Sequence, residues 1–303
     1  MKMGFFPGCS LEGSAREYAE SLRAIAPLLE WELEELPDWN CCGATAAHCL
    51  NHTLSLALPA RILALAERAG LEELLVPCSA CYSRLTATQH EFQLDVELLP
   101  RIGHVIEMEL AGRTQVIHVI HALTRAAGNG LAAKVKEPFR HKVACYYGCY
   151  LTRPLSTSSC QRAEDPQEMD DLMRMIGAES IDWAFKVECC GAGLSVARVD
   201  LVAELSGRII DDAVQRGAEA IIVACPMCHS NLDLRRSAIQ RNRRRRYSIP
   251  VLYVTQAIGL ALGLDERTLG VHRHFVPVRL PEVPCPARIA STREAVAHGA
   301  KEP

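Results

Sequence analysis

Ten of the fourteen cysteines in this chain fall into one pattern that occurs twice. In each copy a single cysteine is followed by Cys-Cys-Gly and then by Cys-x-x-Cys. Between the Cys pair and the Cys-x-x-Cys motif lie 35 residues in the first copy and 34 in the second. Grouped thiolates select iron–sulfur clusters or zinc, so the pattern predicts a metalloprotein with two related sites. The first copy is Cys9, Cys41, Cys42, Cys78 and Cys81, and the second is Cys149, Cys189, Cys190, Cys225 and Cys228.

The number of thiols in each copy distinguishes between these metals. A structural zinc site takes four ligands and has no use for a fifth. Ordinary cubane iron–sulfur clusters also take four cysteines, which would leave two of the ten thiolates unused. The residues therefore favour iron–sulfur over zinc without fixing the type of cluster, and zinc in one half stays open as the alternative.

Four further cysteines have no counterpart in the opposite half: Cys49, Cys145, Cys160 and Cys285. Cys145 is an alternative to Cys149 as the single ligand of the second copy. We choose Cys149 because Gly148-Cys149 matches Gly8-Cys9. Cys49 falls within an expected helix, where a free cysteine usually serves as a small core residue.

Each cysteine group follows a short apolar run and precedes a helical pattern. Strands separated by helices predict parallel sheets, and ligands of such sheets bind beyond the carboxyl ends of the strands. We therefore expect an α/β fold of two pseudo-symmetric, Rossmann-like halves with short parallel sheets and the cysteine loops at the strand ends. The expected strands are 3–6, 31–36, 74–76, 142–147, 181–187 and 220–224, and the expected helices are 14–29, 44–69, 82–92, 164–176 and 192–217.

Length and composition agree with two halves. At 303 residues and 49% hydrophobic content the chain can form about two domains of roughly 150 residues each, and the repeated block places the boundary near the middle. We expect an N-terminal domain over 1–135 and a C-terminal domain over 136–270. A Pro-rich tail over 271–303 completes the chain.

Charge and hydropathy restrict the expected partners and cellular location of the protein. The net charge of −3 favours neither nucleic acid nor membrane, and no run approaches the roughly 18 uncharged apolar residues of a membrane span. Without a secretory signal, we expect a soluble cytoplasmic protein, where clustered thiols indicate metal or redox chemistry rather than disulfides. The arginine-rich run 241–246 is typical of a solvated surface or of a docking site for an acidic partner, and its role is left open.

The doubled cysteine pattern resembles the cysteine-rich CCG domains of the B subunit of heterodisulfide reductase. The resemblance covers about residues 3–265 and includes Phe-Pro-Gly-Cys at 6–9, Cys-Pro-Met-Cys-His-Ser-Asn-Leu-Asp at 225–233 and Pro-Val-Leu-Tyr-Val-Thr-Gln at 250–256. The cysteines alone are also similar to those of the iron–sulfur subunits of glycolate and lactate oxidases and of thiol:fumarate reductase. The segments outside the cysteines favour the heterodisulfide reductase branch.

This resemblance implies two non-cubane [4Fe–4S] clusters, one on each set of five cysteines, and a disulfide that is cleaved or formed between the halves. It also implies a complex with two partner proteins, a ferredoxin-like C subunit and a flavin-containing A subunit. Two alternatives belong to other classes: a non-catalytic electron-transfer or scaffold protein with zinc in one half, and the iron–sulfur subunit of a hydroxyacid oxidase.

Overall fold

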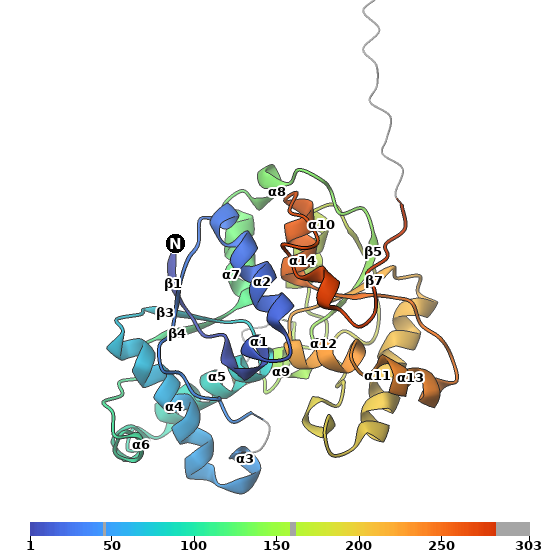
Figure 1. Cartoon of the computed structure of the whole chain (residues 1–303). Coiled ribbons are helices and arrows are strands. Elements are labelled where there is room, and N and C mark those ends of the chain that lie inside the picture. The colour runs from blue at the N-terminus through green and yellow to red at the C-terminus, as the bar shows by residue number, and fades with distance from the viewer. Residues whose placement is uncertain (45–46, 158–161, 283–303) are drawn as a thin grey trace, which may run out of the picture.

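The computed structural model describes residues 1–44, 47–157 and 162–282, and the side chain of His48 is not described. Cys160, Cys285 and the tail beyond 282 therefore lie outside the described residues. The described chain forms two α/β halves side by side, each built on one four-stranded parallel sheet (Figure 1). None of the described helices is long and apolar enough to cross a membrane.

The first sheet has the strand order β2-β1-β3-β4. Its strands are β1 (Lys2–Phe5), β2 (Glu32–Glu35), β3 (Glu73–Val76) and β4 (Gln115–His118). The helices of this half are α1 (Gly8–Glu12), α2 (Arg16–Ile25), α3 (Ala47–Leu50), α4 (His52–Arg68), α5 (Ser79–Leu94), α6 (Leu98–Ile106), α7 (Val119–Gly128) and α8 (Leu131–Lys134), with the short 3-10 helix η1 (Pro27–Leu29).

The second sheet repeats this order as β6-β5-β7-β8. Its strands are β5 (Lys142–Tyr146), β6 (Glu179–Ser180), β7 (Ala220–Val223) and β8 (Val251–Tyr253). The helices are α9 (Cys149–Thr152), α10 (Glu168–Met175), α11 (Val199–Gln215), α12 (Pro226–Leu232), α13 (Arg236–Arg243) and α14 (Val254–Ala261), with the 3-10 helices η2 (Ala192–Leu194) and η3 (Val271–Arg273).

The parallel α/β architecture confirms the expected fold, with differences in detail. The fourth strand of each sheet was not expected, and the strand expected over 181–187 is wrong, because only Glu179–Ser180 pairs with β5. Pro59 lies inside a helix without breaking it. Helix α4 runs through this buried proline, since proline removes only one backbone donor and packing can outweigh the loss.

The two halves pack through equivalent helices. Helix α2 contacts α14, α7 contacts α10, α5 contacts α9, and α1 contacts α12 (Figure 1). One continuous apolar core extends through both sheets, so the pseudo-symmetric interface is itself part of the core. The domain boundaries at 135 and 270 stay a prediction.

Candidate metal centre

All ten cysteines of the doubled pattern lie in loops or first helical turns that follow the carboxyl ends of strands. Cys9 follows β1 at the start of α1, and Cys149 follows β5 at the start of α9. Cys78 and Cys225 directly precede α5 and α12, which carry Cys81 and Cys228. The parallel sheets thus gather residues about seventy positions apart at one edge.

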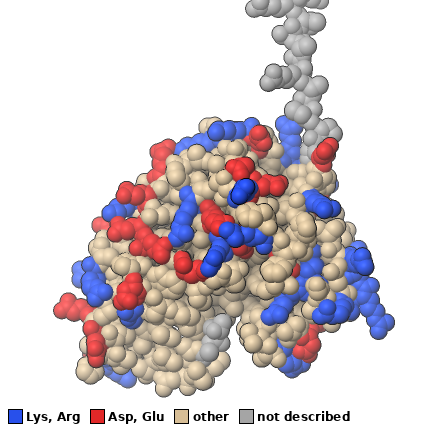
Figure 2. All heavy atoms as spheres, viewed as in Figure 1, with Lys and Arg blue, Asp and Glu red and all other residues tan. Residues whose placement is uncertain are grey.

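The exposure of the thiols follows the same pattern in both halves. The single cysteine and the first member of each Cys pair reach the surface, Cys149 partly and Cys9, Cys41 and Cys189 more fully. The second member of each pair and both cysteines of each Cys-x-x-Cys motif are buried. Each group therefore has an accessible side and a protected side. Figure 2 shows a notch between the halves on the lower edge, just below the place of α1 and α9 in Figure 1.

Short sulfur–sulfur contacts connect the thiols within each half. The Sγ atoms of Cys42 and Cys81 are 3.1 Å apart, and those of Cys9 and Cys41 are 4.0 Å apart. In the second half the Sγ atoms of Cys190 and Cys228 are 3.7 Å apart.

The two groups also meet across the interface. A hydrogen bond with the thiol of Cys225 is the largest cause that raises the pKa of Cys78. On the other side, hydrogen bonds from Cys228 and then from Cys78 lower the pKa of Cys225. Each thiol shifts the pKa of the other, so the first cysteines of the two Cys-x-x-Cys motifs lie close to each other across the interface.

In several thiol pairs, hydrogen bonds lower the pKa of one member. Hydrogen bonds from Cys41 and Cys81 lower the pKa of Cys42, and a hydrogen bond from Cys149 lowers the pKa of Cys189 to about 6. The thiolate is the form that binds metals. The site therefore favours the ligand form of these cysteines at neutral pH.

Backbone N–H groups point at the matching sulfur in each half. The N–H of Gly43 donates to Cys41 Sγ at 3.4 Å, and the N–H of Gly191 donates to Cys189 Sγ at 3.3 Å. Such hydrogen bonds stabilise thiolates and tune the potential of an iron–sulfur cluster. The glycine of the Cys-Cys-Gly motif is thus a part of the site.

The glycine before each single cysteine is needed for a different reason. Gly8 and Gly148 have φ angles of +64° and +70°, a backbone conformation that favours glycine. A Cβ atom on Gly148 would lie 2.9 Å from Cys228 Sγ, and one on Gly8 would lie 3.4 Å from Cys81 Sγ. Each glycine lets the single cysteine approach the last cysteine of its group.

Cys145 lies apart from this arrangement. It sits in β5, fully buried, with its Sγ 3.4 Å from Ser180 Oγ. Burial and the nearby carboxylate of Asp170 raise its pKa, so it stays a neutral thiol. Cys49, expected in the core, is exposed instead, because the short helix α3 leaves this side chain at the surface.

Sequence reasoning missed several side chains that support the thiols. Asn231 donates through Nδ2 to the carbonyl oxygen of Cys190 at 3.1 Å and to its Sγ at 3.5 Å. Ser206 donates to the same carbonyl at 3.1 Å. Asn231 comes three residues after Cys228, so helical spacing could have found it. Ser206 lies in α11, 16 positions after Cys190. No local sequence pattern indicates a contact between these two residues.

The donor set fits an iron–sulfur group better than a single metal ion. Each half brings together five thiols, some of them in short sulfur–sulfur contact, and a backbone N–H donates to the first sulfur of each Cys pair. All-thiolate ligation with hydrogen bonds to sulfur is the environment of iron–sulfur clusters.

Two of the five arginines in the run 241–246 have a structural role. Arg243 pairs with Asp211 and Glu204, and Arg245 lies over the ring of Tyr247 and near Asp211. Positive charge remains at the surface near the end of α13, on the right of Figure 2.

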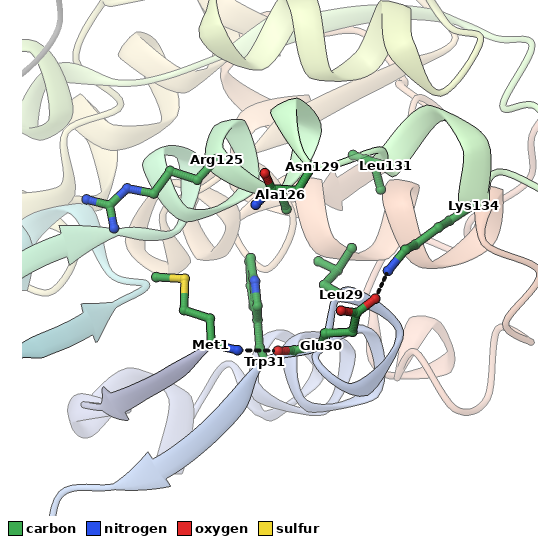
Figure 3. A pocket seen from close by; sticks show the side chains of 9 residues that line it. All are labelled: Met1, Leu29, Glu30, Trp31, Arg125, Ala126, Asn129, Leu131 and Lys134. Carbon is green, nitrogen blue, oxygen red and sulfur yellow. Dashed lines mark hydrogen bonds and ion pairs between the residues drawn. The ribbon is translucent and has the colours of Figure 1, made fainter.

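A small pocket lies at the other edge of the first sheet. It is lined by Met1 and Trp31 at the amino ends of β1 and β2 and by Arg125 and Lys134 of α7 and α8 (Figure 3). Lys134 closes one side through its ion pair with Glu30, at 2.7 Å. None of its lining residues is a cysteine, so it is separate from the thiol site.

Comparison with known proteins shows where the pattern recurs. A family described as "Cysteine-rich domain" matches residues 3–86 and 143–233. The chain is 31% identical to the 8-methylmenaquinol:fumarate reductase membrane anchor subunit of Wolinella succinogenes, over 91% of this chain and 97% of that protein. It is equally 31% identical to the B subunit of the ferredoxin:CoB-CoM heterodisulfide reductase of Methanosarcina mazei, over 91% and 94%.

A solved structure shares the fold. A hypothetical protein from Helicobacter pylori aligns with a TM-score of 0.76 at 14% identity, over 92% of this chain. This chain corresponds to 52% of that structure.

Proposed function

Because the chain belongs to the cysteine-rich CCG-domain family of heterodisulfide reductase B subunits, we propose that it cleaves or forms a disulfide within a heterodisulfide reductase-like complex. The observation that carries this proposal is the proximity of the two five-thiol groups at Cys78 and Cys225, whose preceding residues lie within reach of one tyrosine hydroxyl. Two neighbouring redox centres suit a reaction that moves two electrons.

We propose that each group of five thiolates holds a non-cubane [4Fe–4S] cluster. When bound, such clusters accept and donate single electrons. The chain supplies the thiolates, directs the Gly43 and Gly191 N–H groups at sulfur, and keeps water from the buried cysteines. The single-cysteine side of each group is accessible, which supports entry of a substrate from the notch. Cys149 is preferred to Cys145 because Cys145 bonds to Ser180.

The proposed reaction is R–S–S–R′ + 2 e⁻ + 2 H⁺ giving R–SH and R′–SH, or its reverse. The S–S bond breaks, both sulfurs are reduced, and solvent at the exposed edge provides the protons. The electrons come from partner proteins, for which we propose a ferredoxin-like C subunit and a flavin-containing A subunit in the cytoplasm.

A second candidate function rests on the equal similarity to one component of a quinol:fumarate reductase. In this version the chain transfers electrons within an oxidoreductase and has no disulfide substrate of its own. The iron–sulfur subunit of a hydroxyacid oxidase belongs to the same class, and a scaffold with zinc in one half is the outcome furthest from catalysis.

Metal analysis of anaerobically purified protein separates these functions. Two clusters correspond to roughly eight iron atoms and eight sulfides per chain, whereas roughly four iron with one zinc indicates the scaffold. Each of the variants Cys42→Ser and Cys190→Ser should lose the iron of one half, while Cys49→Ser and Cys145→Ser are the controls and should keep all of it. An electron paramagnetic resonance signal that changes on addition of a thiol or disulfide supports catalysis, and an unchanged signal favours pure electron transfer. Protein without iron would refute both.

A further inference from the structure

One buried side chain joins the two cysteine groups. Tyr18 of α2 is fully buried, and its hydroxyl donates to the carbonyl oxygen of Ala224 at 3.0 Å. The same hydroxyl lies 3.4 Å from the carbonyl oxygen of Pro77. Ala224 and Pro77 directly precede Cys225 and Cys78. Tyr18 therefore contacts both strand ends, next to the first cysteine of each Cys-x-x-Cys motif.

Aromatic stacking fixes the ring of Tyr18. It stacks on Tyr253 at a centroid distance of 4.1 Å and an interplanar angle of 8°. Tyr253 stacks in turn on His229, at 4.3 Å and 16°. Beside the stack, the hydroxyls of Ser21 and Thr255 are 2.6 Å apart and join α2 to α14. The donor of Tyr18 is thus held in place from both halves.

The electrostatic surroundings keep this hydroxyl protonated. Burial raises the pKa of Tyr18 well above its ordinary value, and the charges of Cys225 and Cys78 raise it further. The hydroxyl therefore stays a donor at neutral pH. The bridge is also one-sided, because α10, which occupies the place of α2 in the second half, contains no tyrosine.

We propose that Tyr18 is a positioning residue that sets the separation of the two metal centres by tying the peptide before Cys78 to the peptide before Cys225. This inference rests on the proposed function. Tyr18 has no contact with the surface, so its role is to hold the two loops in register rather than to meet a substrate.

Tyr18→Phe removes the hydroxyl and keeps the stacked ring. Tyr253→Phe is a matched control, because the buried hydroxyl of Tyr253 has no hydrogen-bond partner among the described residues. After iron analysis of the wild-type protein, both variants are reduced until both centres are paramagnetic, and the spin–spin splitting is measured. We expect full iron content in both, a changed splitting in Y18F and an unchanged splitting in Y253F.

A second measurement needs no metal. Metal-free protein is treated with diamide, which oxidises two thiols to a disulfide and is itself reduced to the hydrazine. Mass spectrometry then gives the ratio of the Cys78–Cys225 product to the Cys42–Cys81 product. Loss of one hydrogen bond should lower this ratio about fivefold in Y18F and leave it unchanged in Y253F.

The outcomes are distinct. Wild-type protein without iron would refute the proposed function, while the thiol ratio would still test the bridge. Equal splitting and an equal ratio in Y18F and wild type would overturn the role of Tyr18. A Y18F protein that does not fold would assign Tyr18 to fold stability and would also overturn the proposal.

Discussion

The two halves place their thiols in the same way and support them differently. Both use a glycine with positive φ before the single cysteine and a glycine N–H directed at the first sulfur of the pair. The residues behind these loops are unrelated. The comparison shows that backbone geometry sets the positions of the sulfur atoms, while the surroundings of each site are free to differ.

The largest difference is a buried ionic network found behind the second site. Lys186 Nζ lies 3.3 Å from Asp170 Oδ1 and 3.0 Å from Asp165 Oδ1. Asp170 also accepts a hydrogen bond from Tyr147 at 2.6 Å, and the carbonyl oxygen of Lys186 accepts from the N–H groups of Tyr147 and Gly148. Two residues before its single cysteine, the first half has Pro7 where the second has Tyr147. Proline carries neither a hydroxyl nor a backbone N–H donor, so the first loop cannot make the two bonds that Tyr147 makes.

Breaking this network should have the largest effect on stability. Lys186→Met leaves the fully buried carboxylate of Asp170 without its cation, which should lower the free energy of unfolding by about 3–5 kcal/mol. Denaturant unfolding of the metal-free protein measures the change. Lys2→Met is the control, since it breaks an exposed surface pair with Glu34 and should leave the free energy of unfolding almost unchanged. Equal losses in the two variants would show that the network contributes no more than a surface ion pair.

Replacing each of the two matching glycines by alanine tests whether both sites are packed equally closely around the glycine. Both Gly8→Ala and Gly148→Ala force a left-handed alanine, at about 1–2 kcal/mol each. Only in Gly148→Ala does the new Cβ fall within 3.0 Å of a cysteine sulfur. We expect G148A to lose roughly half of the bound iron, the share of one of two clusters, and G8A to lose less.

Gly70→Ala is the control for backbone strain alone, because Gly70 has a φ of +69° and nothing within 4 Å of the new Cβ. Iron analysis after anaerobic reconstitution gives the ranking. A G70A protein that loses as much iron as G148A would attribute the effect to backbone strain.

The smallest predicted effect is a shift in the reduction potential of one of the two proposed centres. Asn231 donates to Cys190 Sγ, and removing a donor from a cluster thiolate makes reduction less favourable. Asn231→Ala should lower the reduction potential of the second centre by roughly 50 mV and leave the first unchanged. Redox titration followed by electron paramagnetic resonance measures both. A shift of both centres together would show that they titrate as one unit.

Sequence patterns predicted the parts of the site that depend on spacing along the chain. The strands before Cys9 and Cys78 and the helices after them follow from short apolar runs with turn residues between them. The strands β4 and β8 were missed because each has only three or four residues and runs directly into a helix. Tyr18 was missed because its two carbonyl partners lie 59 and 206 positions away. No local sequence pattern indicates a contact between residues so far apart in the chain.

The segment that joins the halves is fastened to both of them. Lys134 donates to Leu28 of the first half, and the N–H groups of Lys136 and Glu137 donate to Ala261 of the second. A connection fastened to both bodies cannot serve as a free hinge. The halves are therefore joined as neighbours around one core rather than by a loose tether.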